Sequence, residues 1–365
     1  MLQAQASKKN LIDQFIASLQ ALPDATAELG GAPSADHRID VGHDAEVALH
    51  VAGKFIHVLV ELKKAVYPRD VRQVLWQVRE LAHDRRADQG VGEALAVLVA
   101  ESISPGAKDL LRAERVGYFD SGGSLYLPAS GAFVYIEKPP PKSLSRSMRS
   151  LFSGRRARVL HGLLVRHRDW LGVKNLAEQT QVSPATASQV LAELERFEWL
   201  ESRGQGPRKQ RRLREPAALL DAWVKQLSLM RPQSLCRFFV PSMRADRLMD
   251  RVGQAFEAHE VEYAISHEAA AQRYAPFLSA VSQVRCRLIA GSAADAAIAE
   301  LGARVVSEGA NLAIIEARSS GDLLFRERVG DIWLASPIQV YLDLLRGEGR
   351  AKEMAEHVRR ERIGF

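Results

Sequence analysis

Residues 176–213 read LAEQTQVSPATASQVLAELERFEWLESRGQGPRKQRRL, and their pattern is the most informative about the structure of the middle of the chain. Apolar residues recur three and four positions apart, which predicts a helix over residues 185–197 with a buried stripe of Ala187, Val190, Leu191 and Leu194. A shorter helix is expected over residues 173–180. Between them, Ser183 is a good N-cap, and Pro184 suits the first helical position because an N–H would have no partner there. The pattern predicts two helices joined by a tight turn.

The exposed face of the second helix is expected to carry short side chains in its first turns. Ser183, Thr186, Ser188 and Gln189 are small or polar. A helix that enters the major groove of DNA needs such residues, because bulk would hold its backbone away from the base edges. These four residues are therefore the predicted DNA-reading set.

A basic two-stranded ribbon is predicted to follow that helix. Residues 199–202 and 208–213 favour strands, and the Gly and Pro of residues 204–207 favour a turn. We expect the tip of the ribbon to lie beside DNA phosphates or in a minor groove. The cations expected to make these contacts are Arg203, Arg208, Lys209, Arg211 and Arg212. In order and spacing, residues 155–215 resemble the winged helix-turn-helix of bacterial transcriptional regulators, although some winged helices serve protein contacts only.

Charge and composition agree with a polyanion as partner. Residues 142–214 hold sixteen Lys and Arg against six Asp and Glu, a net charge of +10, so the rest of the chain sums to −4 within the total of +6. The alternative is a solvated basic face or a targeting patch.

No apolar run is long enough for a membrane helix, and the N-terminus lacks the pattern of a signal peptide. The two cysteines, Cys236 and Cys286, form no close pair, which favours reduced thiols in a cytoplasmic protein without a membrane partner.

The first block, residues 1–137, is expected to be an α/β domain. Two alternating strands, over residues 45–51 and 55–63, surround a turn at Gly53. Further elements are expected as helices over residues 66–82 and 104–113 and as strands over residues 94–100, 116–120 and 124–127. This order resembles the PD-(D/E)xK, or restriction-endonuclease-like, fold. Three prolines then predict a linker over residues 138–145, because proline disfavours both helix and sheet ladder.

The nuclease-like resemblance implies a set of metal-binding and catalytic residues. Glu61 and Lys63 match the E-x-K of that family, in which an acid on the preceding strand completes a Mg²⁺ site. Glu46 lies at the expected strand position, and Asp44 or Asp40 lies just before it. In an active enzyme Asp44 and Glu61 would hold Mg²⁺; otherwise no cofactor is expected. An intact nuclease, a degenerate scaffold and an unrelated α/β domain stay open.

The third block, residues 235–365, is predicted to be a mixed α+β domain after a central domain over residues 146–230. Its expected strands are 238–240, 261–265, 286–289 and 312–315, and its expected helices are 247–259, 267–273 and 293–301. Ser336 and Pro337 open a further helix, and residues 351–362 form the last one. Gly291-Ser292 invites comparison with nucleotidyltransferases, but no Asp-x-Asp follows, so catalysis is not expected here.

Taken in order, the three blocks resemble the AbiEi-type antitoxin family of type IV toxin–antitoxin systems. The pieces that carry the resemblance are VELK (60–63), YFDSGGSLYL (118–127), the winged helix, LLDAW (219–223) and SPIQVYLDL (336–344). Membership implies a repressor that binds double-stranded DNA of its operon and antagonises a nucleotidyltransferase-like toxin, with a C-terminal nucleotidyltransferase-like domain. The oligomeric state stays open, and a homodimer is one possibility. The alternatives are a Mg²⁺-dependent nuclease targeted by its winged helix and a DNA-binding accessory protein of a mobile element.

Overall fold

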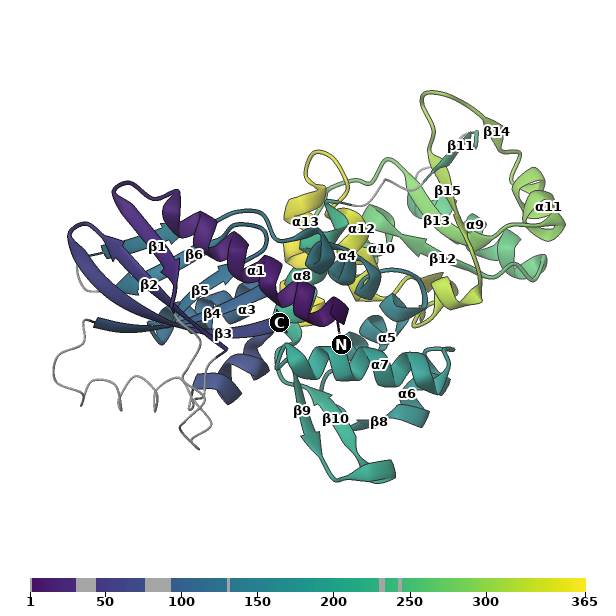
Figure 1. Cartoon of the computed structure of the whole chain (residues 1–365). Helices are drawn as coiled ribbons and strands as arrows, with labels where there is room; N and C mark the ends of the chain where they lie inside the picture. The colour runs from purple at the N-terminus through teal and green to yellow at the C-terminus, as the bar shows by residue number, and fades with distance from the viewer. Residues whose placement is uncertain (1, 31–43, 76–92, 130–131, 230–233, 242–244) are drawn as a thin grey trace. The chain divides into compact units, whose positions relative to one another are not determined.

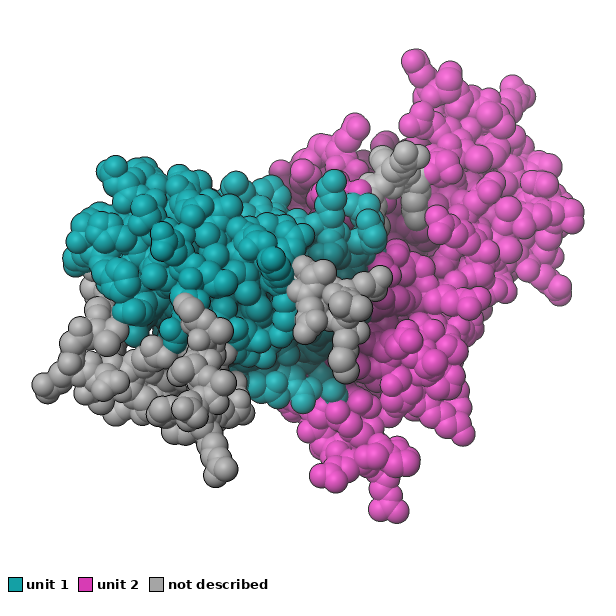
Figure 2. All heavy atoms as spheres, viewed as in Figure 1, with its two compact units in different colours: residues 1–149, 193–198 teal, residues 150–192, 199–365 magenta. Residues whose placement is uncertain are grey.

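The computed structural model describes residues 2–30, 44–75, 93–129, 132–229, 234–241 and 245–365, and it has the expected mixed α+β character (Figure 1). The chain divides into two compact units, which are described separately below. The first holds residues 1–149 and 193–198, and the second holds residues 150–192 and 199–365 (Figure 2). Among the helices that the structure describes, none combines the length and apolar character that a membrane crossing requires.

The described strands of the first unit form one seven-stranded sheet in chain order. They are β1 (Ala25–Leu29), β2 (Ala45–Val51), β3 (Lys54–Val66), β4 (Glu93–Ile103), β5 (Gly117–Asp120), β6 (Leu125–Ala129) and β7 (Ala132–Ile136). Strands β3, β4 and β5 are parallel, and the other neighbours are antiparallel. The hairpin of β2 and β3 turns through Ala52 and Gly53, both with positive φ, which confirms the turn predicted at Gly53.

Helices cover both faces of this sheet because its central strands carry buried apolar residues at consecutive positions, such as Val97, Leu98 and Val99 of β4. Helix α1 (Leu2–Gln20) places Phe15 and Leu19 in one core with the even positions of β3, such as Val58 and Val60. The opposite core holds Leu98 and residues of α3 (Pro105–Ala113). Residues 68–75 are helical, so the helix expected over residues 66–82 is confirmed that far, and its remainder lies outside the described residues.

The motif YFDSGGSLYL is held by a buried ion pair. Lys108 of α3 lies 2.8 Å from a carboxylate oxygen of Asp120, and both side chains are buried. The Asp120 carboxylate also accepts the backbone N–H of Gly122 at 2.9 Å, and Lys108 donates to the hydroxyl of Ser124 at 2.8 Å. These bonds satisfy two charges that would otherwise be costly to bury. The polar residues of this motif therefore stabilise the β5–β6 turn.

The linker predicted over residues 138–145 is wrong in its second half. Residues 138–141 belong to no helix or strand, but helix α4 (Lys142–Leu151) begins immediately after Pro141. The carbonyl of Pro141 accepts the N–H of Ser145 at 3.1 Å. Proline is tolerated at this point because a residue before the first helical turn must supply a carbonyl and needs no N–H of its own.

Residues 154–227 contain the elements predicted from residues 176–213. They are α5 (Gly154–Val165), β8 (Leu171–Gly172), α6 (Val173–Gln179), α7 (Pro184–Arg196), β9 (Leu200–Arg203), the 3₁₀ turn η1 (Gly206–Arg208) and β10 (Gln210–Leu213), followed by α8 (Pro216–Leu227). The three strands pair antiparallel in the order β8-β10-β9. The two helices and the ribbon are confirmed, whereas the short β8 was not predicted.

The remainder of the second unit is a mixed sheet with helices. Its described strands lie in the order β14-β11-β15-β13-β12-β17-β16, with β13 parallel to β15 and β12 parallel to β17. In chain order they are β11 (Cys236–Phe239), β12 (Tyr263–Ser266), β13 (Val284–Ile289), β14 (Arg304–Val305), β15 (Leu312–Ala317), β16 (Glu327–Val329) and β17 (Ile332–Leu334). The helices are α9 (Ala245–Ala258), α10 (His267–Tyr274), α11 (Ser292–Glu300), α12 (Pro337–Leu344) and α13 (Ala351–Val358). The helices and four of the strands were predicted; β14, β16 and β17 were not.

Candidate nucleic-acid interface

The first turns of α7 present short polar side chains to solvent. Ser183, Ser188 and Gln189 are exposed and Thr186 is partly exposed, whereas Ala187, Val190 and Leu191 are buried on the other side of the helix. The hydroxyl of Ser183 accepts the backbone N–H of Thr186 at 3.2 Å and lies 2.9 Å from the hydroxyl of Thr186. Ser183 therefore caps the helix as predicted, and the exposed face holds no bulky residue that would keep a nucleic acid at a distance.

The ribbon formed by β9 and β10 is basic at its tip. Arg203 and Arg208 are exposed, and Lys209 is partly exposed. Arg203 donates from Nε and Nη2 to the side-chain oxygen of Gln210 at 2.9 and 2.8 Å, across the last residue pair of the ribbon. This bond orients the guanidinium group at the base of the turn. The predicted cations Arg203, Arg208 and Lys209 thus lie where they were expected.

Two of the predicted wing-tip cations lie within the sheet instead. Arg211 is only 9% exposed, because β10 is the central strand of β8-β10-β9 and Arg211 points to the same side as the buried Leu213. Arg212 pairs with Glu201 on the neighbouring strand at 2.7 Å. The expectation that Arg211 and Arg212 contact DNA from the tip is therefore corrected: Arg211 is largely withdrawn from solvent, and the charge of Arg212 is partly neutralised.

A polar hollow of about 550 Å³ beside the ribbon extends the basic surface. Its wall includes Trp170, whose ring lies under the guanidinium groups of Arg203 at 4.4 Å and Arg212 at 4.8 Å. Arg166 and Arg168, from the loop after α5, also line it. None of Trp170, Arg166 and Arg168 was among the predicted DNA contacts. The sequence did carry a sign of them: an aromatic residue among cations just before the predicted second helix is a composition that suits base stacking and phosphate contacts.

The nuclease-like residues of the first unit come together only in part. On β3, Lys63 forms an ion pair with Glu61 at 2.7 Å. Strands β2 and β3 run antiparallel, with Glu46 opposite Leu59 and Ala45 opposite Val60. The same register, continued by one residue, sets Asp44 opposite Glu61. Glu46 and Asp44 therefore lie on the same face of the sheet as Glu61, with Asp44 directly opposite it and Glu46 two residues further along, and the choice of first acid stays open between them. Asp40 lies outside the described residues.

The described residues around Glu61 do not fit a preformed metal site. One carboxylate oxygen of Asp44 accepts the N–H of Leu62 at 2.8 Å, and the other lies 2.9 Å from Nζ of Lys8 on α1. Within the part of the chain that the structure describes, no three His, Cys, Asp or Glu side chains lie close enough to share a metal ion. A Mg²⁺ site here would require Asp44 to give up its present bonds.

The segment SPIQVYLDL has a structural role at the start and along one face of α12. Ser336 caps the helix by accepting the N–H of Gln339 at 3.2 Å. Asp343 is buried and accepts hydrogen bonds from Arg287 at 2.5 Å, from Gln339 at 2.8 Å and from Ser266. Burial alone would raise the pKa of Asp343, but the positive charge of Arg287 and these hydrogen bonds outweigh it and hold the pKa below its ordinary value. Asp343 is therefore an ionised, fully paired core residue.

Comparison with known proteins identifies no relative of this chain. No family model, no curated protein and no solved structure matches the chain.

Proposed function

We propose that this protein is a sequence-specific DNA-binding transcriptional regulator that acts through a winged helix-turn-helix. The observation that carries the proposal is the short polar face of α7 combined with a basic antiparallel ribbon in the element order α5, β8, α6, α7, β9, β10. That order and this distribution of side chains are what a helix in a major groove with a flanking wing requires. Double-stranded DNA is the proposed partner, and a cytoplasmic location belongs to the same proposal.

Each part of the proposed interface has a distinct role. Ser188 and Gln189 are exposed on α7 and would contact base edges, where a glutamine amide can pair with adenine in two hydrogen bonds. Arg203, Arg208 and Lys209 on the wing would contact phosphates, which contribute affinity and little sequence preference. The cations and Trp170 of the neighbouring hollow would extend the phosphate contacts beyond the wing.

A more specific role, that of a repressor antitoxin, belongs to the same proposal. It is supported by the resemblance of the quoted motifs to the AbiEi-type family and by their order along the chain. In that role the protein would bind the DNA of its own operon and antagonise a nucleotidyltransferase-like toxin, and a homodimer would read paired half-sites. A mobile-element accessory protein would use the same winged helix, and the neighbouring genes would separate the two.

The wing is tested by replacing one exposed cation. Arg208→Ala should weaken binding to duplexes of any sequence and reduce the slope of log affinity against log salt by about one, because one phosphate contact is lost. Fluorescence anisotropy titrations at several salt concentrations measure both quantities. Arg304→Ala, on the exposed strand β14, is the matched control and should leave the slope unchanged. Equal behaviour of the two variants would refute the role of the wing.

Base reading is tested separately with Gln189→Ala. Selection from a random duplex pool should yield a less defined sequence for this variant than for the original protein, while the salt slope stays the same. The two readouts separate base contacts from phosphate contacts. If both proteins select the same sequence with equal strength, Gln189 has no part in recognition.

A second candidate function is a Mg²⁺-dependent DNA nuclease in the first unit. The specific observation in its favour is the register that sets Asp44 opposite Glu61, two residues from Lys63, on strands of an α1, β1, β2, β3, helix, β4 arrangement. Supercoiled plasmid incubated with the whole protein and Mg²⁺ tests it, with Lys63→Ala as the variant. Cleavage that is lost in Lys63→Ala supports the nuclease, and no cleavage by either protein, or equal cleavage by both, rejects it.

A further inference from the structure

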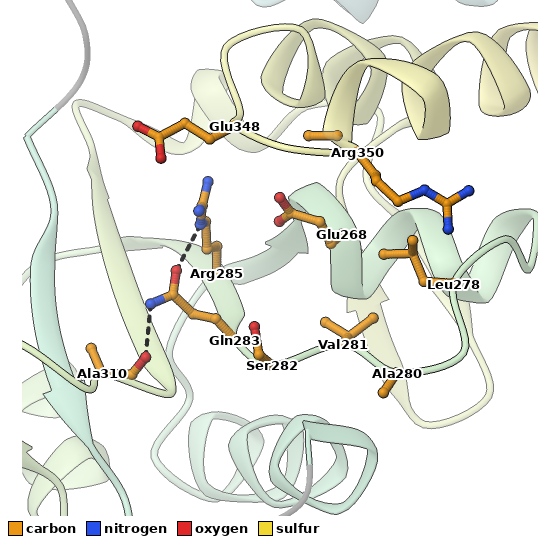
Figure 3. A pocket seen from close by; sticks show the side chains of 11 residues that line it. Glu268, Leu278, Ala280, Val281, Ser282, Gln283, Arg285, Ala310, Glu348 and Arg350 are labelled. Atoms are coloured by element: carbon orange, nitrogen blue, oxygen red, sulfur yellow. Dashed lines mark hydrogen bonds between the residues drawn. The ribbon is translucent and has the colours of Figure 1, made fainter.

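A second hollow in the second unit is lined by residues that are not among the proposed DNA contacts. It has a volume of about 290 Å³, near the lower end for small-molecule sites. Its wall combines the first turn of α10, the residues leading into β13, Ala310 and the turn before α13 (Figure 3). Its lining includes four charged side chains: Glu268 on α10, Arg285 on β13, the exposed Glu348, and Arg350 (Figure 3).

Arg285 is held in place by a relay of side-chain hydrogen bonds. Its Nε donates to the side-chain oxygen of Gln283 at 2.8 Å, and the amide nitrogen of Gln283 donates to the carbonyl of Ala310 at 2.9 Å (Figure 3). Because the relay uses Nε, the two terminal nitrogens of the guanidinium group are left to face the hollow. Two such nitrogens match the two oxygens of a carboxylate.

Glu268 supplies the opposite charge, and Arg285 does not neutralise it. The two side chains line the same hollow, yet no ion pair within 4.0 Å joins them among the described residues. The other cation of the wall, Arg350, pairs with Glu353 at 3.1 Å and lies over the ring of Phe277 at 4.8 Å. Figure 3 shows the Arg350 guanidinium directed away from Glu268. The hollow thus presents a cation that the relay holds in place and a separate carboxylate, Glu268, with no ion pair between the two.

We propose that this hollow binds a free α-amino acid with a small apolar side chain. The ligand carboxylate pairs with the terminal nitrogens of Arg285, and its ammonium group pairs with Glu268, so one zwitterion satisfies both charges at once. The apolar part of the wall, which includes Leu278 and Val281, faces the ligand side chain (Figure 3). The size of the hollow limits the ligand to a single small molecule.

Isothermal titration of the whole protein with L-alanine, L-valine and L-leucine, each measured alone, tests the proposal. At least one should bind with a Kd of about 1 mM or tighter. The amide of that amino acid, which lacks the carboxylate, and the matching carboxylic acid without the amino group should each bind at least about tenfold weaker, because each loses one charge-assisted pair. Absence of binding by all three at about 10 mM overturns the proposal.

Single substitutions locate the site. Arg285→Gln and Glu268→Gln should each weaken the best amino acid about tenfold or more, and Glu308→Gln, an exposed glutamate outside the wall, should not. Circular dichroism checks that each variant is folded, and Glu268→Gln together with the two analogues decides the matter if Arg285→Gln is unfolded. Unchanged affinity in Glu268→Gln would refute the site. No DNA is present in this assay, so its failure leaves the proposed regulator untouched.

Discussion

Two charged residues, Arg287 and Asp343, are buried in the core of the second unit, where they pair with each other. Asp343 lies among Arg287, Ser266 and Gln339, and both members of the Arg287–Asp343 pair are almost fully buried. A buried ion pair contributes little net stability over an apolar pair, but the loss of one member leaves an isolated charge in a poorly polarisable environment. The pair therefore makes the core sensitive to single substitutions.

Asp343→Asn should lower the free energy of unfolding by about 3–5 kcal/mol, because it removes the buried carboxylate that pairs with Arg287. Urea denaturation at neutral pH measures the change. Asp331→Asn, at an exposed turn, is the control and should change stability by less than about 0.5 kcal/mol. A loss in Asp343→Asn no larger than that of the control would mean that Arg287 finds another partner.

At the scale of elements, the wing depends on two glycines that differ in their surroundings. Gly204 and Gly206 both have positive φ, at 72° and 54°. A Cβ atom on Gly204 would lie 2.9 Å from the backbone oxygen of Arg208, whereas one on Gly206 would meet nothing within 4 Å. The same substitution therefore has a conformational cost at both positions and a steric cost at only one.

Gly204→Ala should destabilise the protein by more than Gly206→Ala, whose cost is about 1 kcal/mol from the left-handed backbone alone. If the wing contacts DNA, Gly204→Ala should also weaken binding more, because the turn that presents Arg208 must shift. Parallel urea denaturation and anisotropy titrations compare the pair. Equal effects on stability would contradict the close approach of residues 204 and 208.

At the scale of the whole molecule, the second unit joins the winged-helix segment to the C-terminal sheet through polar contacts. His161 of α5 lies 2.5 Å from the hydroxyl of Ser336, Arg158 pairs with Asp322 at 3.3 Å, and Asp221 of α8 pairs with Arg359 at 2.7 Å. The ring of His161 packs between those of Trp223 and Phe325. Residues assigned by sequence to two domains thus share one compact unit.

His161 makes the stability of this unit depend on pH. Burial, assisted by the charge of Arg287 and opposed by that of Asp343, lowers the pKa of His161 from 6.5 to about 4. The unfolded chain therefore binds a proton below pH 6.5 that the folded chain does not bind until about pH 4. Stability is fully present above pH 6.5 and should fall by roughly 2–3 kcal/mol as the pH decreases through this window.

His161→Gln should remove most of that dependence, because glutamine keeps a hydrogen-bonding group near Ser336 but does not titrate. Urea denaturation between pH 7.5 and 4.5 would compare it with the original protein and with a His50→Gln control on the exposed side of β2. If His161→Gln loses stability over this range as steeply as the His50→Gln control does, another group is responsible.

Local sequence patterns predicted the helices of residues 173–196, the Ser183 cap, the basic ribbon and the turn at Gly53. These features depend on periodicity, capping and backbone preference, which act between residues close in the chain. Long-range packing was needed to show that Arg211 is buried, that Asp44 lies directly opposite Glu61, and that Glu268 and Arg285 share a hollow. Strand order, register and the approach of distant segments depend on how whole elements pack, and local spacing does not specify them.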